Sequence, residues 1–220
     1  MTNDVKIFIG VITATFVLIA GAVFLVGRTD RTSSNATGKT LASQVVSPDI
    51  LERPDSWKIG SESAKVTVTE FGDYQCPACK ATEATTQALR TKYEGKIRFV
   101  WRHFPLTQLH EFAFDSALAV EAAGKQGKFW DYHQKLFEIS PDLQKDKLEN
   151  LAKDLGLDLD RFNKDKNSDE TRQRILTDQA DGNKAGVSGT PTYYINGVKL
   201  ELDRLPTLSD FSAKIDPLLK

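Results

Sequence analysis

The chain has 220 residues, of which 40% are hydrophobic and 27% are charged. A chain of this length and composition can bury the core of one medium-sized domain, with some residues left over. Its 29 basic and 30 acidic side chains give a formal net charge of -1. Because there is no large positive excess to neutralise phosphates, we do not expect nucleic acid as a partner.

A hydrophobic run without charged residues, 7–26, follows a short N-terminal tail of residues 1–6. As a helix this run would span roughly 30 Å, the thickness of a bilayer core, so residues 7–27 are predicted to form a transmembrane anchor. A cleaved signal peptide is the alternative, because residues 20–22 have the small-x-small pattern of a cleavage site. We favour the anchor because the run is longer than the apolar part of a usual signal peptide.

The segment 28–56 is rich in Ser, Thr, Asn and Asp and is predicted to be a flexible tether. Basic residues flank both ends of the hydrophobic run, with Lys6 before it and Arg28 and Arg31 after it. Since the positive-inside rule depends on an asymmetry of these charges, the sequence leaves the orientation of the anchor open.

A β-α-β unit is predicted after the tether. Residues 66–71 alternate as a strand does and place Glu70 on the same face as two valines. Pro77 suits the first turn of a helix, which would then run to Tyr93. Residues 96–104 are rich in β-branched and aromatic side chains, as expected of a second strand.

Helical periodicity follows the second predicted strand. In residues 127–138 the large side chains, His133 among them, fall on one stripe that we interpret as core packing. Asn196-Gly197 between two β-rich runs predicts a type I′ hairpin, and a closing helix is predicted over 207–219. This order predicts an α/β fold, in which one sheet with helices on both faces is interrupted by a helical insertion at about 106–186.

The two cysteines of the chain, Cys76 and Cys79, lie two residues apart at the start of the first predicted helix. The free N–H groups and the positive dipole end of this helix would stabilise Cys76 as a thiolate. Cys79, one turn further on, can come close enough for a disulfide and would act as the resolving thiol.

Two other interpretations of the cysteine pair remain as alternatives. A zinc site would need two more ligands from three histidines that show no paired spacing. A structural disulfide would stabilise the chain little, because the loop that it closes is so short. Redox chemistry is therefore the favoured interpretation, with a redox-active Cys76–Cys79 disulfide and with no metal or other cofactor.

Four stretches of the sequence together resemble the DsbA-like branch of the thioredoxin superfamily: AKVTVTEFGDYQCPACK, FVWRHFPL, FWDYHQKLF and GVSGTPTYYING. The resemblance covers about 59–220, and we expect one DsbA-like domain over residues 57–220. It implies a thioredoxin-like fold with an inserted helical domain, and thiol-disulfide oxidoreductase activity.

The resemblance also implies roles for further residues. Thr190 and Pro191 would form a cis pair that faces the cysteines and presents the Thr190 backbone to an extended substrate, against the alternative of a trans proline that begins a strand. Glu70 would be a buried acid that takes the proton from Cys79, against the alternative of a solvated acid on an edge strand. His103 is interpreted as structural. Four residues would shape the rim of the site and its redox potential: Tyr74, Gln75, Pro77 and Ala78.

The sequence therefore predicts a single-pass, membrane-anchored oxidoreductase whose catalytic domain lies outside the cytoplasm. It would oxidise thiols of unfolded or extended exported proteins, because disulfides persist outside the cytosol and because the family implies this direction. A quinone-linked membrane partner would then reoxidise the cysteine pair. A reductase or isomerase of the same fold, and an anchored peptide-binding chaperone module, are the alternatives.

Overall fold

The computed structural model describes residues 45–220. The predicted tail (1–6), the predicted anchor (7–27) and the first part of the predicted tether lie outside the described residues. Within the described part of the chain, no helix combines the length and the apolar character that crossing a bilayer requires.

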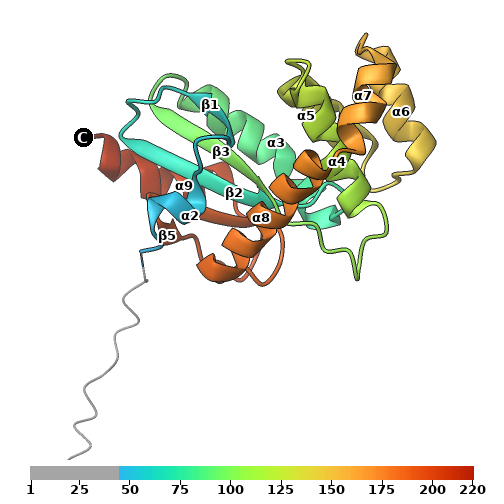
Figure 1. Cartoon of the computed structure of the whole chain (residues 1–220). Helices are drawn as coiled ribbons and strands as arrows, with labels where there is room; N and C mark the ends of the chain where they lie inside the picture. Colours follow the sequence, from blue (N-terminus) through green and yellow to red (C-terminus); the bar gives the residue numbers. More distant parts are fainter. Residues whose placement is uncertain (1–44) are drawn as a thin grey trace, which may run out of the picture. The chain divides into compact units, whose positions relative to one another are not determined.

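A five-stranded mixed sheet forms the centre of the domain, with the strand order β1-β3-β2-β4-β5 (Figure 1). β2 (Val66–Gly72) runs parallel to β3 (Ile97–His103), and β1 (Trp57–Gly60) pairs with the other side of β3 in the antiparallel sense. β4 (Thr192–Ile195) is antiparallel to β2, and β5 (Val198–Lys199) forms a hairpin with β4. β2 is thus a central strand.

Helices cover both faces of this sheet, as predicted. α3 (Pro77–Lys92) connects β2 to β3 and confirms the predicted β-α-β unit. Side chains of α3 and of α9 (Leu208–Ile215) share one apolar cluster with the sheet, which includes Val66, Val68, Leu89, Phe99 and Phe211. On the opposite face, Phe71 packs edge-to-face against Phe104 and Tyr194. The alternation of β2 therefore places Glu70 on the face that α3 covers.

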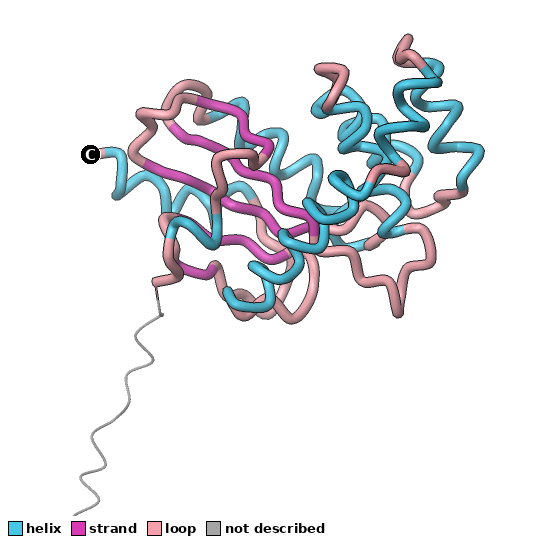
Figure 2. The backbone as a smooth tube through the Cα atoms, in the orientation of Figure 1, coloured by secondary structure: helices cyan, strands magenta, loops and turns pink. Residues whose placement is uncertain are grey.

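The helices between β3 and β4 build the insertion. They are α4 (Ala113–Gly124), α5 (Phe129–Ile139), α6 (Lys145–Asp154), α7 (Leu159–Lys166) and α8 (Asp169–Ala185). α4 is buried at every position from residue 116 to residue 124, because the other helices of the insertion pack around it. In Figure 2, α4 to α7 gather beside one end of the sheet and the long α8 leads the chain back along the strands.

The C-terminal elements follow the prediction closely. Asn196 and Gly197 have φ angles of 46° and 84°, both in the left-handed region that a type I′ hairpin turn requires. The predicted closing helix, 207–219, is α9 followed by a 3₁₀ turn, η1 (Asp216–Leu219). The α-helix ends just before Pro217 because proline provides no N–H for the next hydrogen bond.

The predicted tether (28–56) is wrong at its C-terminal end. α2 (Pro48–Leu51) packs against α8, and Leu51 is buried. The Val46 N–H donates to the carbonyl of Gly197 at 2.8 Å, which covers part of the hairpin edge. β1 was also not predicted. Residues 46–56 therefore belong to the folded domain, although their composition is as polar as that of a tether.

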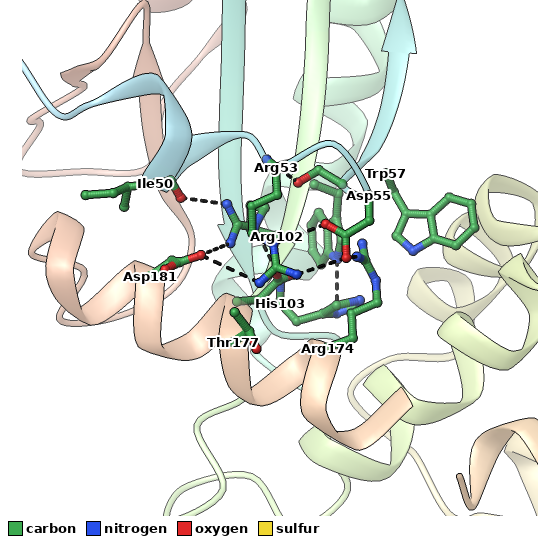
Figure 3. Close-up of polar contacts among 12 residues, drawn as sticks. Ile50, Arg53, Asp55, Trp57, Arg102, His103, Arg174, Thr177 and Asp181 are labelled. Atoms are coloured by element: carbon green, nitrogen blue, oxygen red, sulfur yellow. Dashed lines mark hydrogen bonds and ion pairs between the residues drawn. The ribbon is translucent and has the colours of Figure 1, made fainter. Parts of the chain in front are cut away.

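Buried ion pairs hold this N-terminal segment on the domain (Figure 3). Arg102 on β3 is fully buried and donates from Nε to Asp178 and from Nη2 to Asp181, both on α8 and both at 2.8 Å. Its Nη1 donates to the carbonyl of Ile50 at 2.6 Å. Because a buried charge is costly unless it is paired and hydrogen-bonded, these contacts select one arrangement of α2, β3 and α8.

A second buried acid, Glu121 on α4, connects the insertion to the sheet. Its Oε1 accepts a hydrogen bond from Trp57 Nε1 at 2.7 Å and lies 2.8 Å from His103 Nε2. Its Oε2 lies 2.8 Å from Nε of Arg174, which also pairs with Asp55 at 2.6 Å. These contacts support the structural role expected for His103.

Candidate redox site

Cys76 is the N-cap residue of α3, and Pro77 occupies the first turn of the helix. Since Pro77 has no N–H, the first backbone donors that reach the Cys76 sulfur are those of Ala78 and Cys79. The Cys79 side chain contributes the largest effect, and these hydrogen bonds together lower the pKa of Cys76 to about 5 although partial burial acts to raise it. Cys76 is thus a thiolate at neutral pH.

Cys79 is a much weaker acid than Cys76. Its side chain is 1% exposed, against 6% for Cys76, and both cysteines are free thiols in this structure. Burial raises the pKa of Cys79 well above its usual range, and the hydrogen bond with Cys76 and the nearby Glu70 carboxyl add to the increase. The pair therefore consists of a charged, more accessible sulfur and a protonated, enclosed one.

The loop before β4 places Thr190 beside Cys76. Cys76 Sγ lies 3.3 Å from the Thr190 carbonyl oxygen, to which the protonated thiol can donate, and the Thr190–Pro191 peptide bond is cis. The Thr190 hydroxyl is buried, bonds to no other described protein group, and acts to lower the pKa of Cys76. The structure thus brings both predicted substrate-binding residues to the cysteine pair.

Glu70 is buried beneath the cysteines, with 2% of its surface exposed. The alternative of a solvated acid on an edge strand is therefore excluded, because β2 lies between β3 and β4. Burial is the largest cause that raises the pKa of Glu70, and repulsion from Glu83 is the second. Arg90 and Tyr193 act against them, and the resulting pKa is about 8. Among the described residues, Glu70 Oε2 has no hydrogen-bond partner. Glu70 is therefore mostly protonated at neutral pH.

The four predicted rim residues divide into two groups. Those that are partly or fully exposed beside Cys76 are Gln75, Pro77 and Ala78. Tyr74 is not a rim residue, and this prediction is wrong. It is 1% exposed, its hydroxyl lies 2.9 Å from His133 Nδ1, and its ring packs against Trp101 with centroids 5.0 Å apart. The turn before Cys76 directs Tyr74 inward, under the helical insertion.

Gly72, the last residue of β2, makes room for this packing. A Cβ atom on Gly72 would overlap the indole ring of Trp101, which is itself fully buried. The Trp101 ring therefore occupies the space of a missing side chain next to the active-site turn.

A partly buried polar group on α3, Glu83, was missed by sequence reasoning. Glu83 Oε1 accepts from Arg90 Nη2 at 2.9 Å, and Glu83 Oε2 lies 3.5 Å from His133 Nε2 on α5. Burial acts to raise the pKa of Glu83, but His133 and Arg90 outweigh it and hold the pKa at about 2. The available signal was the spacing of Cys79, Glu83 and Arg90, which places all three on one side of a helix.

Two thiols of unequal acidity, a protonated carboxyl group and a backbone acceptor meet at one helix N-terminus. This arrangement can exchange one disulfide for another. Within residues 45–220, no three His, Cys, Asp or Glu side chains gather as metal ligands would.

The fold and the site together are those of a thioredoxin-like protein with a Cys-x-x-Cys pair. A thioredoxin family model matches residues 52–217, which is most of the chain. The chain belongs to this family.

Several solved structures share this fold. A thioredoxin-like oxidoreductase from Silicibacter pomeroyi has a TM-score of 0.69 and 27% identity, covering 78% of this chain and 97% of that one. The thiol-disulfide exchange protein α-DsbA2 from Wolbachia pipientis has a TM-score of 0.68 and 25% identity, covering 77% and 90%. BdbD from Bacillus subtilis has a TM-score of 0.64 and 26% identity, covering 74% and 91%. The predicted thioredoxin-like fold, with similarity to DsbA-like oxidoreductases, is confirmed.

Curated relatives are much longer than this chain. The Na⁺/H⁺ antiporter NhaA 1 of Salinispora arenicola is 42% identical over 138 residues, which are 63% of this chain and 21% of that protein. The Na⁺/H⁺ antiporter NhaA of Herminiimonas arsenicoxydans is 32% identical over 157 residues, covering 70% and 25%. The chain thus spans about a fifth to a quarter of the length of these relatives.

Proposed function

We propose that this chain is a thiol-disulfide oxidoreductase that introduces disulfides into exported proteins. The observation that carries the proposal is the unequal acidity of its two cysteines. The pKa of Cys76 is lowered to about 5, whereas burial raises the pKa of Cys79. Only the thiolate form of a cysteine attacks or leaves readily, so this difference assigns separate roles to the two sulfurs.

The cycle starts from the Cys76–Cys79 disulfide. A substrate thiolate attacks Cys76 Sγ and forms a mixed disulfide, while the bond between the two cysteines breaks and Cys79 leaves with the electron pair. A thiolate at Cys79 would be buried and basic, so it takes up a proton. Glu70, with a pKa of about 8, still holds a proton at neutral pH and supplies it in this proposed step.

A second substrate thiolate completes the exchange. It attacks the substrate sulfur of the mixed disulfide and forms the product disulfide, and Cys76 leaves as a stabilised thiolate. Two substrate thiols have then lost two electrons, which reduce the enzyme disulfide, and two protons, which pass to the solvent. One proton returns from the solvent to Glu70, which gave its own proton to Cys79. A low pKa at Cys76 makes the reduced enzyme more stable, which favours this oxidising direction. We propose a quinone-linked membrane partner as the acceptor that restores the disulfide.

The position of the Thr190 carbonyl favours an extended protein chain as the substrate. The carbonyl oxygen lies 3.3 Å from Cys76 Sγ and accepts a hydrogen bond only from the protonated thiol. Cys76 has no such proton to donate as a thiolate or in a disulfide. The carbonyl is then available for an N–H of an extended substrate chain, which can pair with it as an added strand.

We also propose that residues 7–27 anchor the domain in the cell membrane as a single span, with the domain outside the cytoplasm. The uncharged run at 7–26 supports a membrane location. The curated relatives add support, because segments similar to this domain belong to proteins named as Na⁺/H⁺ antiporters, which are membrane proteins by that name.

The test of this function is the redox equilibrium of the purified full chain with glutathione, with Cys76→Ser as the inactive control. We expect a reduction potential well above the value of about −270 mV typical of thioredoxin. A potential near that value would assign the chain as a reductase. A wild-type chain that forms no mixed disulfide with glutathione would favour the peptide-binding module. Labelling of intact cells with a membrane-impermeant thiol reagent, after a membrane-impermeant reductant has opened the Cys76–Cys79 disulfide, tests the location, and full protection would place the domain inside.

A further inference from the structure

The turn that leads into Cys76 is bound to the helical insertion through Asp73. Asp73 is 1% exposed, and its Oδ1 accepts from the Gln75 N–H at 2.8 Å. Its Oδ2 accepts from the Leu106 N–H at 2.9 Å and lies 2.7 Å from His110 Nδ1. Its backbone carbonyl accepts from the Cys76 N–H at 3.2 Å. One buried residue therefore connects the cysteine to the loop that opens the insertion.

Gln75 makes a second connection to the same loop. Its Oε1 accepts from the Phe112 N–H at 2.6 Å, directly before α4. Its Nε2 donates to the Pro141 carbonyl at 3.4 Å, in the segment after α5. Asp73 and Gln75 thus take three hydrogen bonds from residues 106–112, although more than thirty positions separate the partners in sequence.

These contacts bear on the geometry of the cysteine pair. The thiolate of Cys76 depends on backbone donors at Ala78 and Cys79, and the Asp73 backbone makes a hydrogen bond that acts to lower the pKa of Cys79. Hydrogen bonds weaken steeply when their angles change. The direction of these donors therefore depends on where the turn 73–76 is held.

We propose that Asp73, together with His110, is the positioning element of the redox site: it joins the loop 106–112 to the active-site turn and fixes Cys76 at the N-terminus of α3. This inference rests on the proposed function. The Asp73 side chain contacts backbone groups and His110 rather than the sulfurs, so its effect on the reaction passes through the turn.

The first test is Asp73→Asn in the full chain. Asparagine has one carbonyl oxygen and one NH₂ group, so in either orientation an N–H must face the N–H of Gln75 or that of Leu106. We expect the rate of disulfide transfer from the oxidised protein to a dithiol peptide to fall roughly 10- to 100-fold, as a displaced reacting group would cause. The thiolate absorbance of Cys76 should also titrate at higher pH than in the wild type.

The second test compares two substitutions of His110. His110→Ala removes the donor to Asp73 and should slow disulfide transfer. His110→Asn carries an N–H close to the position of Nδ1 and should restore most of the rate. Glu111→Gln is the matched control, because it removes one negative charge from an exposed neighbour and should leave rate and titration as in the wild type.

The outcomes separate this inference from the proposed function. Wild-type rate and titration in both Asp73→Asn and His110→Ala would overturn the inference, and so would a loss of rate that His110→Asn does not restore. A lower melting temperature with unchanged rate and titration would also overturn it, by making Asp73 a residue of stability alone. If Asp73→Asn does not fold, the two His110 variants decide. A wild-type chain that transfers no disulfide would instead refute the proposed function.

Discussion

The burial of Glu70 predicts how the stability of the domain changes with pH. The pKa of Glu70 is about 8 in the folded protein, against an ordinary value of 4.5. Between these two values the unfolded chain has lost the proton and the folded chain keeps it. The free energy of unfolding should therefore fall as the pH rises from 4.5 to about 8. By pH 7 the loss from this one group is about 3 kcal/mol, at about 1.4 kcal/mol for each pH unit.

Glu70→Gln keeps the shape of the side chain and removes the charge. Between pH 4.5 and pH 7, the free energy of unfolding of the wild type should fall by about 3 kcal/mol relative to that of Glu70→Gln. The measurement is urea unfolding of a fragment of residues 43–220, which forms a compact unit, at a series of pH values. The Cys76–Cys79 disulfide should be intact in both proteins, so that neither thiol titrates.

The matched control is Glu149→Gln, which removes a negative charge from an exposed position on α6. Its pH profile should follow that of the wild type. Parallel profiles for the wild type and Glu70→Gln would refute the reasoning, because they would show that Glu70 has the same pKa in the folded and unfolded chains.

Three further predictions address the cysteines and the ion pairs. The ionisation of Cys76, with a pKa of about 5 against an ordinary 9.0, should stabilise the reduced protein above pH 9, with the effect lost as the pH falls through 5. At pH 7 this amounts to about 3 kcal/mol. Because Glu70 contributes the opposite dependence over much of the same range, the comparison is between reduced Glu70→Gln and reduced Glu70→Gln/Cys76→Ser, and equal pH profiles of urea unfolding for the two would contradict the prediction. Cys79→Ser should accumulate mixed disulfides with substrate proteins, visible on non-reducing gels, because its Cys76 thiolate attacks disulfides already formed in them, one substrate sulfur leaves as a thiolate, and no resolving thiol then releases Cys76. Cys76→Ser should not accumulate them; the reverse result would exchange the two roles. Arg102→Ala should cost about 3–5 kcal/mol in urea unfolding, because it leaves Asp178 buried without its partner, and a loss below about 1 kcal/mol would show that water replaces the guanidinium.

The sequence predicted those parts of the fold whose signals are local. Strand β2 alternates within seven residues, Pro77 marks a helix start, and Asn196-Gly197 selects its turn without help from the rest of the chain. The position of Cys76 at a helix N-terminus could be predicted for the same reason, while the redox roles of the two cysteines stay a prediction. The predicted anchor at 7–27 stays a prediction.

The missed parts depend on partners that are distant in sequence. Residues 46–56 fold because Arg102 and α8 hold them, and nothing within the segment itself indicates this. Tyr74 was placed on the rim because it adjoins the cysteines, yet its hydroxyl meets His133, 59 positions away. Asp73 could not be recognised for the same reason, because its partners arrive from the loop after β3.

The contact between Gly72 and Trp101 has a consequence for the evolution of this domain. A side chain at position 72 and an indole at position 101 would compete for one volume. The two positions should therefore covary among homologues: where alanine or a larger residue replaces the glycine, a smaller residue should replace the tryptophan. Homologues that keep the tryptophan should keep the glycine, even where their cysteine dipeptides differ.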